Sequence, residues 1–171
     1  MRISIICYSL TGHTEDMASE IKKGIEEEGV EARIFNIKDS VVDPDYVASS
    51  SGLIIGTPTY LASSVWQIKK WLEEDSRSLN LSGKLGGAFA TAHYAQGGQD
   101  TAIMDILGQL LVKGMLVYSG GGSFGLPIIH HGPVALDKVG NHYEESREMF
   151  RIYGSRFARK AREIFSLDSQ A

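Results

Sequence analysis

The chain opens with the almost wholly apolar run Ile3-Ser4-Ile5-Ile6-Cys7-Tyr8, which leads directly into Ser9-Leu10-Thr11-Gly12-His13-Thr14. A short apolar run of this kind is typical of a strand that is buried on both faces of a parallel sheet. Glu15-Asp16-Met17-Ala18 then begins an amphipathic helix pattern. Because the turn joins a strand to a helix N-terminus, it brings free backbone N–H groups together with the positive end of the helix dipole. The stretch therefore predicts a phosphate-binding turn.

The residue types of this turn narrow the ligand. No Lys or Arg lies between Ser9 and Thr14, and the stretch lacks the Gly-x-x-x-x-Gly-Lys-Ser/Thr pattern of nucleoside triphosphate sites. The Gly-x-Gly-x-x-Gly pattern of dinucleotide sites is absent as well. A monophosphate held by hydroxyls, backbone N–H groups and a helix dipole fits this composition. The alternative, with equal weight at this point, is a capped helix whose Ser and Thr residues hold no ligand.

Outward from this unit, strand and helix patterns alternate along the chain. Further strands are expected at Glu31–Ile37, Gly52–Thr57, Gly87–Thr91 and Met115–Tyr118, and helices at Thr14–Glu28, after Ser64, at Asp100–Lys113 and at Asn141–Phe165. The glycine-rich segment Ser119–Gly140 is predicted to be irregular. Such alternation predicts an α/β fold, a parallel sheet with helices on both faces. Right-handed crossovers then place every strand-to-helix loop at the carboxyl edge of the sheet.

Length, charge and cysteine content exclude several classes of protein. A chain of 171 residues is expected to form a single domain, residues 1–171. The net charge of −4, with both signs spread along the sequence, argues against nucleic acid or an anionic membrane as the main partner. Apolar runs are far shorter than the ~20 residues that span a bilayer, so no membrane insertion is expected. Cys7 is the only cysteine, so no internal disulfide can form and a cytoplasmic location is expected.

Two later loops are expected to face the first one across the sheet edge. Thr57-Pro58-Thr59-Tyr60 follows the third strand and offers a stiff turn and a flat aromatic face. The alternative for this segment is a proline turn with a surface tyrosine. The third loop, Thr91–Asp100, contains His93, Tyr94 and the pair Gly97-Gly98, where backbone can approach a ligand closely. Together the three loops predict a pocket for a planar, phosphorylated ligand.

The residues of these loops also resemble a known family. Ser9-Leu10-Thr11-Gly12-His13-Thr14 is similar to the flavodoxin phosphate loop, Ser/Thr-x-Thr-Gly-x-Thr. Gly56–Tyr60, Gly97–Ile103 and Gly121–Gly125 resemble the flavodoxin-like NAD(P)H:quinone oxidoreductases of the Trp-repressor-binding-protein group. The resemblance implies a three-layer flavodoxin-like fold, with a five-stranded parallel sheet of order 2-1-3-4-5. It also implies FMN as cofactor and a homo-dimer or tetramer as assembly.

Matching positions imply a role for each loop residue. The residues expected to hold the FMN phosphate are Ser9, Leu10, Thr11, Gly12, His13 and Thr14. Those expected to flank the isoalloxazine ring are Pro58, Thr59, Tyr60 and Leu61, and those at its pyrimidine end are Thr91, Ala92, His93, Tyr94, Gly97 and Gly98. The residues predicted to lie beside a substrate are Phe124, His130 and His131. His130-His131 has no Cys, Asp or Glu at ligand spacing, so no metal site is predicted.

The resemblance leaves an enzyme and an electron carrier to be compared. Pro58–Val65 and Ala92–Gln99 contain no acidic residue, although carrier flavodoxins usually have acidic residues around their flavin loops. This favours an oxidoreductase in which NAD(P)H reduces the flavin and a quinone-like acceptor then takes the electrons. Since the flavin supplies the chemistry, no catalytic acid or base is predicted. The alternative is a flavodoxin-type electron carrier with a redox protein as partner, and Thr11 fits it, because the quinone reductases usually have tyrosine there.

Overall fold

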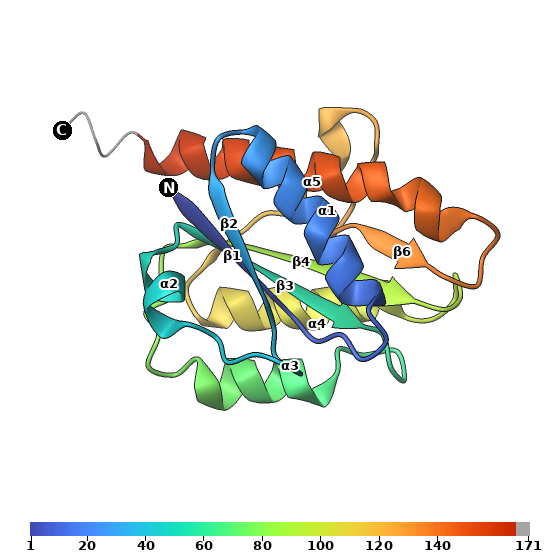
Figure 1. Ribbon diagram of the computed structural model, residues 1–171, viewed down its shortest axis with the longest axis horizontal. Helices are drawn as coiled ribbons and strands as arrows, with labels where there is room; N and C mark the ends of the chain where they lie inside the picture. Colours follow the sequence, from blue (N-terminus) through green and yellow to red (C-terminus); the bar gives the residue numbers. More distant parts are fainter. Residues whose placement is uncertain (167–171) are drawn as a thin grey trace.

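The computed structural model describes residues 1–166, which form a sheet between two layers of helices (Figure 1). The strands are β1 (Arg2–Cys7), β2 (Glu31–Asn36), β3 (Gly52–Pro58), β4 (Leu85–Ala92), β5 (Leu116–Val117) and β6 (Val134–Leu136). The helices are α1 (His13–Glu27), α2 (Pro44–Ser49), α3 (Trp66–Lys70), α4 (Gln99–Val112) and α5 (His142–Phe165). A π-helical turn, η1 (Trp71–Asp75), continues α3, and a 3-10 turn, η2 (Gly122–Phe124), lies between β5 and β6. None of the helices in this described part is both long and apolar enough to cross a bilayer.

The sheet is parallel and has the order β2-β1-β3-β4-β5, which confirms the predicted α/β topology. The fifth position, however, is shared by two short strands. β5 pairs with Leu85 and Gly86 at the start of β4, whereas β6 pairs with residues 90–92 at its end. The prediction of an irregular Ser119–Gly140 is therefore wrong for Val134–Leu136. A three-residue strand is too short to show a period in the sequence, and its conformation depends on the pairing with β4.

Both faces of the sheet are buried, as the apolar β1 run requires. Ile3 and Ile5 pack in the core between the sheet and helices α1 and α5. Ile6 points to the other face and packs in the core between the sheet and helices α3 and α4. In Figure 1, α1 and α5 lie above the sheet, and α3 and α4 lie below it. Cys7 is fully buried, and burial raises the pKa of its thiol well above the ordinary value. The thiol is therefore an inert core group, as expected.

Two glycines let α1 and α5 approach until their backbones touch. A Cβ built on Gly24 would lie 1.8 Å from the carbonyl oxygen of Arg151, and one on Gly154 would lie 2.1 Å from that of Ile21. Neither position has room for a side chain. This contact fixes α1, whose N-terminus follows the first loop, against the longest helix of the molecule.

Candidate functional site: a cleft at the carboxyl edge of the sheet

A cleft opens at the carboxyl edge, where the loops after β1, β3, β4 and β6 meet. It is lined by Leu10, Thr11, His13, Thr14, Pro58, Thr59, Tyr60, Thr91, Ala92, His93, Ala135, Asp137 and Tyr143. The parallel strands bring these residues together because their carboxyl ends all reach the same edge, as the arrowheads of β3, β4 and β6 show (Figure 1).

The first loop, residues 9–14, is fixed at both ends by hydrogen bonds, and the backbone N–H groups between its ends are free. The N–H of Ser9 donates to Oδ1 of Asn36 at 3.1 Å, and the N–H of Glu15 donates to Oγ of Ser9 at 3.2 Å. Among the hydrogen bonds within residues 1–166, none is donated by a backbone N–H of residues 10–14. Gly12 precedes α1 with φ of 94°, a left-handed conformation that suits glycine. Consecutive free N–H groups at a helix N-terminus form a cradle for an anion.

Asn36, at the end of β2, fixes the shape of this cradle. Its side chain is buried and its Nδ2 donates to the carbonyl of Ser9 at 3.2 Å and to Oε2 of Glu15 at 3.0 Å. Together with the bond that its Oδ1 accepts from Ser9, the amide uses both its donor and its acceptor on the first loop. These three hydrogen bonds hold the cradle in its shape.

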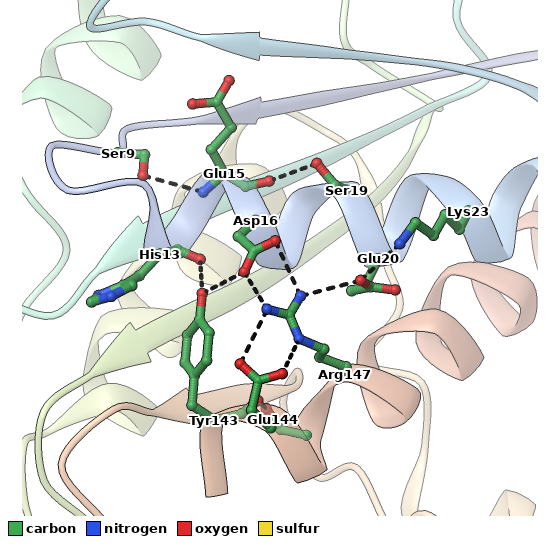
Figure 2. A network of polar contacts seen from close by, with 11 residues as sticks. Ser9, His13, Glu15, Asp16, Ser19, Glu20, Lys23, Tyr143, Glu144 and Arg147 are labelled. Atoms are coloured by element: carbon green, nitrogen blue, oxygen red, sulfur yellow. Dashed lines mark hydrogen bonds and ion pairs between the residues drawn. The ribbon is translucent and has the colours of Figure 1, made fainter. Parts of the chain in front are cut away.

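Figure 2 shows how the start of α1 is fastened to the start of α5. Arg147 pairs with Asp16 at 2.6 Å and with Glu20 at 3.2 Å, and the hydroxyl of Tyr143 donates to Oδ2 of Asp16 and to the carbonyl of His13. The hydrogen bond from Arg147 lowers the pKa of Asp16, although burial opposes the shift. Burial and the nearby Asp16 raise the pKa of Tyr143, so its hydroxyl keeps the proton that it donates.

The second loop contains a strained turn and an unused hydroxyl. Tyr60 and Ser63 exchange backbone hydrogen bonds, and between them Leu61 and Ala62 have φ of 51° and 59°. Positive φ at both central residues is usually left to Asn and Gly. The hydroxyl oxygen of Thr59 is buried and has no hydrogen-bond partner among residues 1–166. A buried polar atom without a partner at the wall of a cleft is a place where a ligand can bind.

The third loop closes against the other two. The hydroxyls of Thr91 and Thr14 share a hydrogen bond of 2.9 Å, and the N–H of Thr59 donates to the carbonyl of Thr91 at 2.8 Å. Gly98 directly precedes α4 with φ of 83°, and a Cβ there would lie 2.4 Å from that of Ala62. The three loops thus form one connected wall.

The loop after β6 adds a carboxylate to the cleft. Asp137 accepts a hydrogen bond of 2.6 Å from Nδ1 of His93, and its other oxygen lies 3.3 Å from Nδ1 of His13. Burial opposes ionisation of Asp137, but the hydrogen bond from His93 and the neighbouring positive charges outweigh burial and lower its pKa. Residues 1–166 contain no group of three side chains suited to a metal ion.

Comparison with known proteins shows the family to which this chain belongs. The family model described as flavodoxin matches residues 5–102. A flavodoxin of Clostridium saccharobutylicum is 45% identical over 166 residues, which cover 96% of this chain and 100% of the relative. The chain belongs to the flavodoxin family.

More distant flavodoxin relatives include enzymes. The quinone-oxidoreductase QR2 of Triphysaria versicolor is 29% identical over 146 residues, covering 72% of this chain and 71% of the relative. Among solved structures, a Fusobacterium nucleatum flavodoxin bound to flavin mononucleotide superposes with a TM-score of 0.68 at 20% identity, covering 95% of this chain and 98% of that one. The last likeness shows that the fold is shared.

Most of the expected cofactor residues of this flavodoxin chain line the cleft itself. The others lie behind or beside the wall. Ser9 is buried beneath the first loop, where it caps Glu15, and Gly98 packs against Ala62. Leu61 and Tyr94 project outward, with 102% and 62% of their surface exposed. The lining also omits Gly12 and Gly97, which shape the backbone of their loops.

The structure does not bring Phe124 or the two adjacent histidines to the cleft. Phe124 lines a different cavity, beside Tyr118 and Arg156. The buried guanidinium of Arg156 donates to the carbonyls of residues 120 and 124–127, and this holds the segment against α5. His130 and His131 are exposed, and Nδ1 of His131 lies 3.4 Å from Asp100. Their substrate role stays a prediction.

Sequence reasoning missed Ala135, Asp137, Tyr143 and the buried anchor Asn36. One signal for Asp137 is present in the sequence, because a polar residue directly follows the apolar triplet Val134–Leu136. Asn36 likewise stands at the carboxyl end of a strand, which is where a parallel sheet places its site residues. Tyr143 has no such signal, since its place depends on how α5 packs against α1.

Proposed function

We propose that this chain binds FMN and carries electrons between redox partners, as a flavodoxin does. The observation that carries the proposal is the row of free backbone N–H groups at residues 10–14, at the N-terminus of α1. Such a row binds the phosphate of a mononucleotide without any Lys or Arg. The Clostridium saccharobutylicum relative, 45% identical and matched over its whole length, supports the carrier role.

The residues around the cleft fit the remainder of FMN. The partnerless hydroxyl of Thr59 and the ring of Tyr60 lie on one wall, and Thr91 to His93 lie on another. An aromatic ring beside polar backbone suits a flavin, which is flat, with apolar faces and polar edges. The Fusobacterium nucleatum flavodoxin, which shares this fold, is itself bound to flavin mononucleotide.

In this proposal the protein holds the cofactor and the flavin supplies the redox chemistry. The first loop binds the phosphate through its N–H groups, and Asn36 keeps that loop in shape. Tyr60 and Pro58 line the cleft and would lie beside the ring, where they would shield it from water. No side chain of the cleft is assigned a catalytic proton transfer.

A second candidate function is NAD(P)H:quinone oxidoreduction. It is supported by the absence of acidic residues from Pro58–Val65 and Ala92–Gln99, since these two loops then offer no carboxylate to a basic partner protein. The relationship to quinone-oxidoreductase QR2 supports it as well. In this case NAD(P)H is the donor and a quinone-like molecule the acceptor.

Substitution of Thr11 tests the phosphate site. Thr11→Asp places a negative charge beside the free N–H groups, so we expect FMN binding to weaken at least ~100-fold, about 2.7 kcal/mol, as measured by flavin fluorescence titration. Thr11→Asn is the matched control, since it has the same size without the charge, and it should retain binding within ~5-fold. Equal affinities of the two variants would mean that the phosphate binds elsewhere.

Reduction of the FMN-loaded protein separates the two functions. A carrier takes electrons from a ferredoxin reductase, and NADH or NADPH alone reduces it only slowly. A quinone reductase is reduced directly by NADH or NADPH and is reoxidised by added quinone. Stopped-flow absorbance of the flavin band distinguishes these cases, and a protein that binds no FMN contradicts both.

A further inference from the structure

The Asp137 carboxylate joins two histidines that come from different loops of the cleft. Its Oδ1 accepts from Nδ1 of His93 at 2.6 Å, and its Oδ2 lies 3.3 Å from Nδ1 of His13. The Asp137 side chain is only 12% exposed, whereas those of His13 and His93 are 43% and 63% exposed. One buried carboxylate thus serves two imidazoles that line the cleft.

Backbone hydrogen bonds hold Asp137 beside the third loop, and each imidazole has an aromatic neighbour. The N–H of Asp137 donates to the carbonyl of Ala92, and that of Lys138 donates to the carbonyl of His93, both at 3.1 Å. The His13 ring lies 5.1 Å from the Tyr143 ring, and the His93 ring lies 6.0 Å from that of Tyr94. Each imidazole directs Nδ1 toward the Asp137 carboxylate, so Nε2 is the atom left to meet a ligand.

The chemistry of this pair complements the first loop. His13 is the only residue between Ser9 and Thr14 that can carry a positive charge. An imidazole that directs Nδ1 to a carboxylate can donate from Nε2 to a phosphate oxygen when it is protonated. Histidine ordinarily changes its charge between pH 5 and 8, so such a donor is available at low pH and lost at high pH.

We infer that Asp137 is a positioning residue that holds His13 and His93 as cations of the cleft, and that they favour a phosphorylated ligand at low pH. The inference rests on the proposed function and deepens it, since it adds two side chains to the backbone N–H groups that distinguish FMN from riboflavin, which lacks the phosphate.

Other charged groups around the imidazoles are already paired or lie on the outer side. On the elements packed around the pair, these groups are Glu15 and Asp16 of α1, Tyr94 of the third loop, Lys138 after β6, and Tyr143, Glu144 and Arg147 of α5. Asp16 and Glu144 both pair with Arg147, and Glu15 accepts from Asn36. Asp137 is therefore the carboxylate that faces both histidines.

The experiment compares FMN and riboflavin binding at about pH 6 and about pH 8.5, on either side of the histidine titration. His13→Gln keeps a hydrogen-bonding side chain that cannot become cationic. At the lower pH we expect it to weaken FMN binding ~3-fold, as a partly exposed ion pair does. At the higher pH the loss should fall below ~1.5-fold, and riboflavin binding should change little at either pH. His93→Gln should show a smaller effect of the same sign, since His93 is more exposed. The phosphate of FMN itself titrates near pH 6. Because each variant is compared with the wild type at the same pH, this titration affects both proteins equally and cancels.

Asp137→Asn tests the positioning role, because it removes the carboxylate that both imidazoles face at nearly constant size. We expect it to reduce the gain in affinity for FMN over riboflavin that the wild type shows between about pH 8.5 and about pH 6. A purely structural role of Asp137 would change FMN and riboflavin binding equally at both pH values. That result, or a His13→Gln effect that is equal at both pH values or equal for riboflavin, overturns the inference while FMN binding itself stands. A wild-type protein that binds no FMN overturns the proposed function, and the inference with it.

Discussion

The two helical faces of the sheet are fastened in different ways. On the α1–α5 face, Gly24 and Gly154 bring two backbones into contact, and Arg147 joins the helix starts. On the α3–α4 face, a cavity lies between the helices, and Met104 and Val112 are 48% and 89% exposed beside it. Backbone contact and a half-buried ion network therefore join the helices of the α1–α5 face, whereas a cavity separates those of the α3–α4 face.

The loops that enter these faces differ in the same way. The first loop leads to α1 and puts its left-handed residue on Gly12, which adopts that conformation without strain. The second loop leads to α3 and puts left-handed conformations on Leu61 and Ala62, which disfavour them. A phosphate group is the same in every redox state of a flavin, whereas the ring changes its charge. We infer that the strain-free loop suits the phosphate and the strained one suits the ring.

Insertion of a methyl group between α1 and α5 should give the largest effect. Gly154→Ala would place a Cβ 2.1 Å from the Ile21 carbonyl, so the helices must separate. We expect the free energy of unfolding to fall by about 3 kcal/mol, measured by urea denaturation. FMN binding should weaken too, because the start of α1 moves with the helix.

Gly108→Ala on α4 is the matched control, since a Cβ at Gly108 meets nothing within 4 Å. A glycine replaced inside a helix without a clash should stabilise the protein by roughly 0.5–1 kcal/mol. Opposite signs for the two substitutions would establish that the faces differ in packing. A loss at Gly154 below about 0.5 kcal/mol would contradict the backbone contact.

Removal of Arg147 should have the next largest effect. The Arg147→Met variant keeps most of the side-chain volume but leaves Asp16 without its ion pair and Glu20, 11% exposed, with Lys23 alone. The network is half-buried, so we expect a loss of about 1–2 kcal/mol in unfolding free energy, between the values for buried and exposed pairs. Lys69→Met, which breaks the exposed pair between Lys69 of α3 and Glu73 of η1, should cost less than about 0.5 kcal/mol.

Arg147→Met should also change how the stability of the protein depends on pH in the acid range. Arg147 lowers the pKa of Asp16 in the folded state, so the ion pair stabilises the fold above the ordinary Asp pKa of about 3.9. That contribution is lost as the pH falls through the lowered folded pKa. The stability difference between wild type and Arg147→Met should therefore shrink below about pH 4. Urea denaturation at a series of pH values measures it, and a constant difference would show that the ion pair with Asp16 contributes nothing.

The three loops after β1, β3 and β4 were predictable because each follows a strand long enough to show an apolar pattern. The cleft residues after β6 were not. Val134–Leu136 pairs with β4 only after the chain has left the sheet at residue 118 and returned, and an apolar triplet is too short to predict that pairing. Tyr143 reaches the cleft because Gly24 and Gly154 set the distance between α1 and α5, a property of two helices and not of one segment.

The placement of Phe124 shows that a sequence pattern can be recognised without predicting where its residues lie. A glycine-rich segment after the fifth strand resembles the family pattern, yet its position here depends on one buried arginine twenty-nine or more residues away. Arg156 donates to carbonyls from Gly120 to Pro127 and holds them against α5. A pattern of side chains predicts which residues are apolar, but it does not predict which carbonyls a distant guanidinium will bind.

Relief of the strained turn should give the smallest effect and the most direct information on the second loop. Leu61 is fully exposed, so Leu61→Asn removes little packing, and asparagine tolerates the left-handed conformation better than leucine. We expect the FMN-free protein to gain about 0.5–1 kcal/mol in urea denaturation. Val41→Asn, at an exposed position without positive φ, is the control and should change stability by less than about 0.5 kcal/mol. If the gain disappears when FMN is bound, the turn leaves its left-handed conformation as the ring enters. An equal gain with and without FMN would mean that the strain is kept, and it would contradict the idea that the second loop adjusts to the ring.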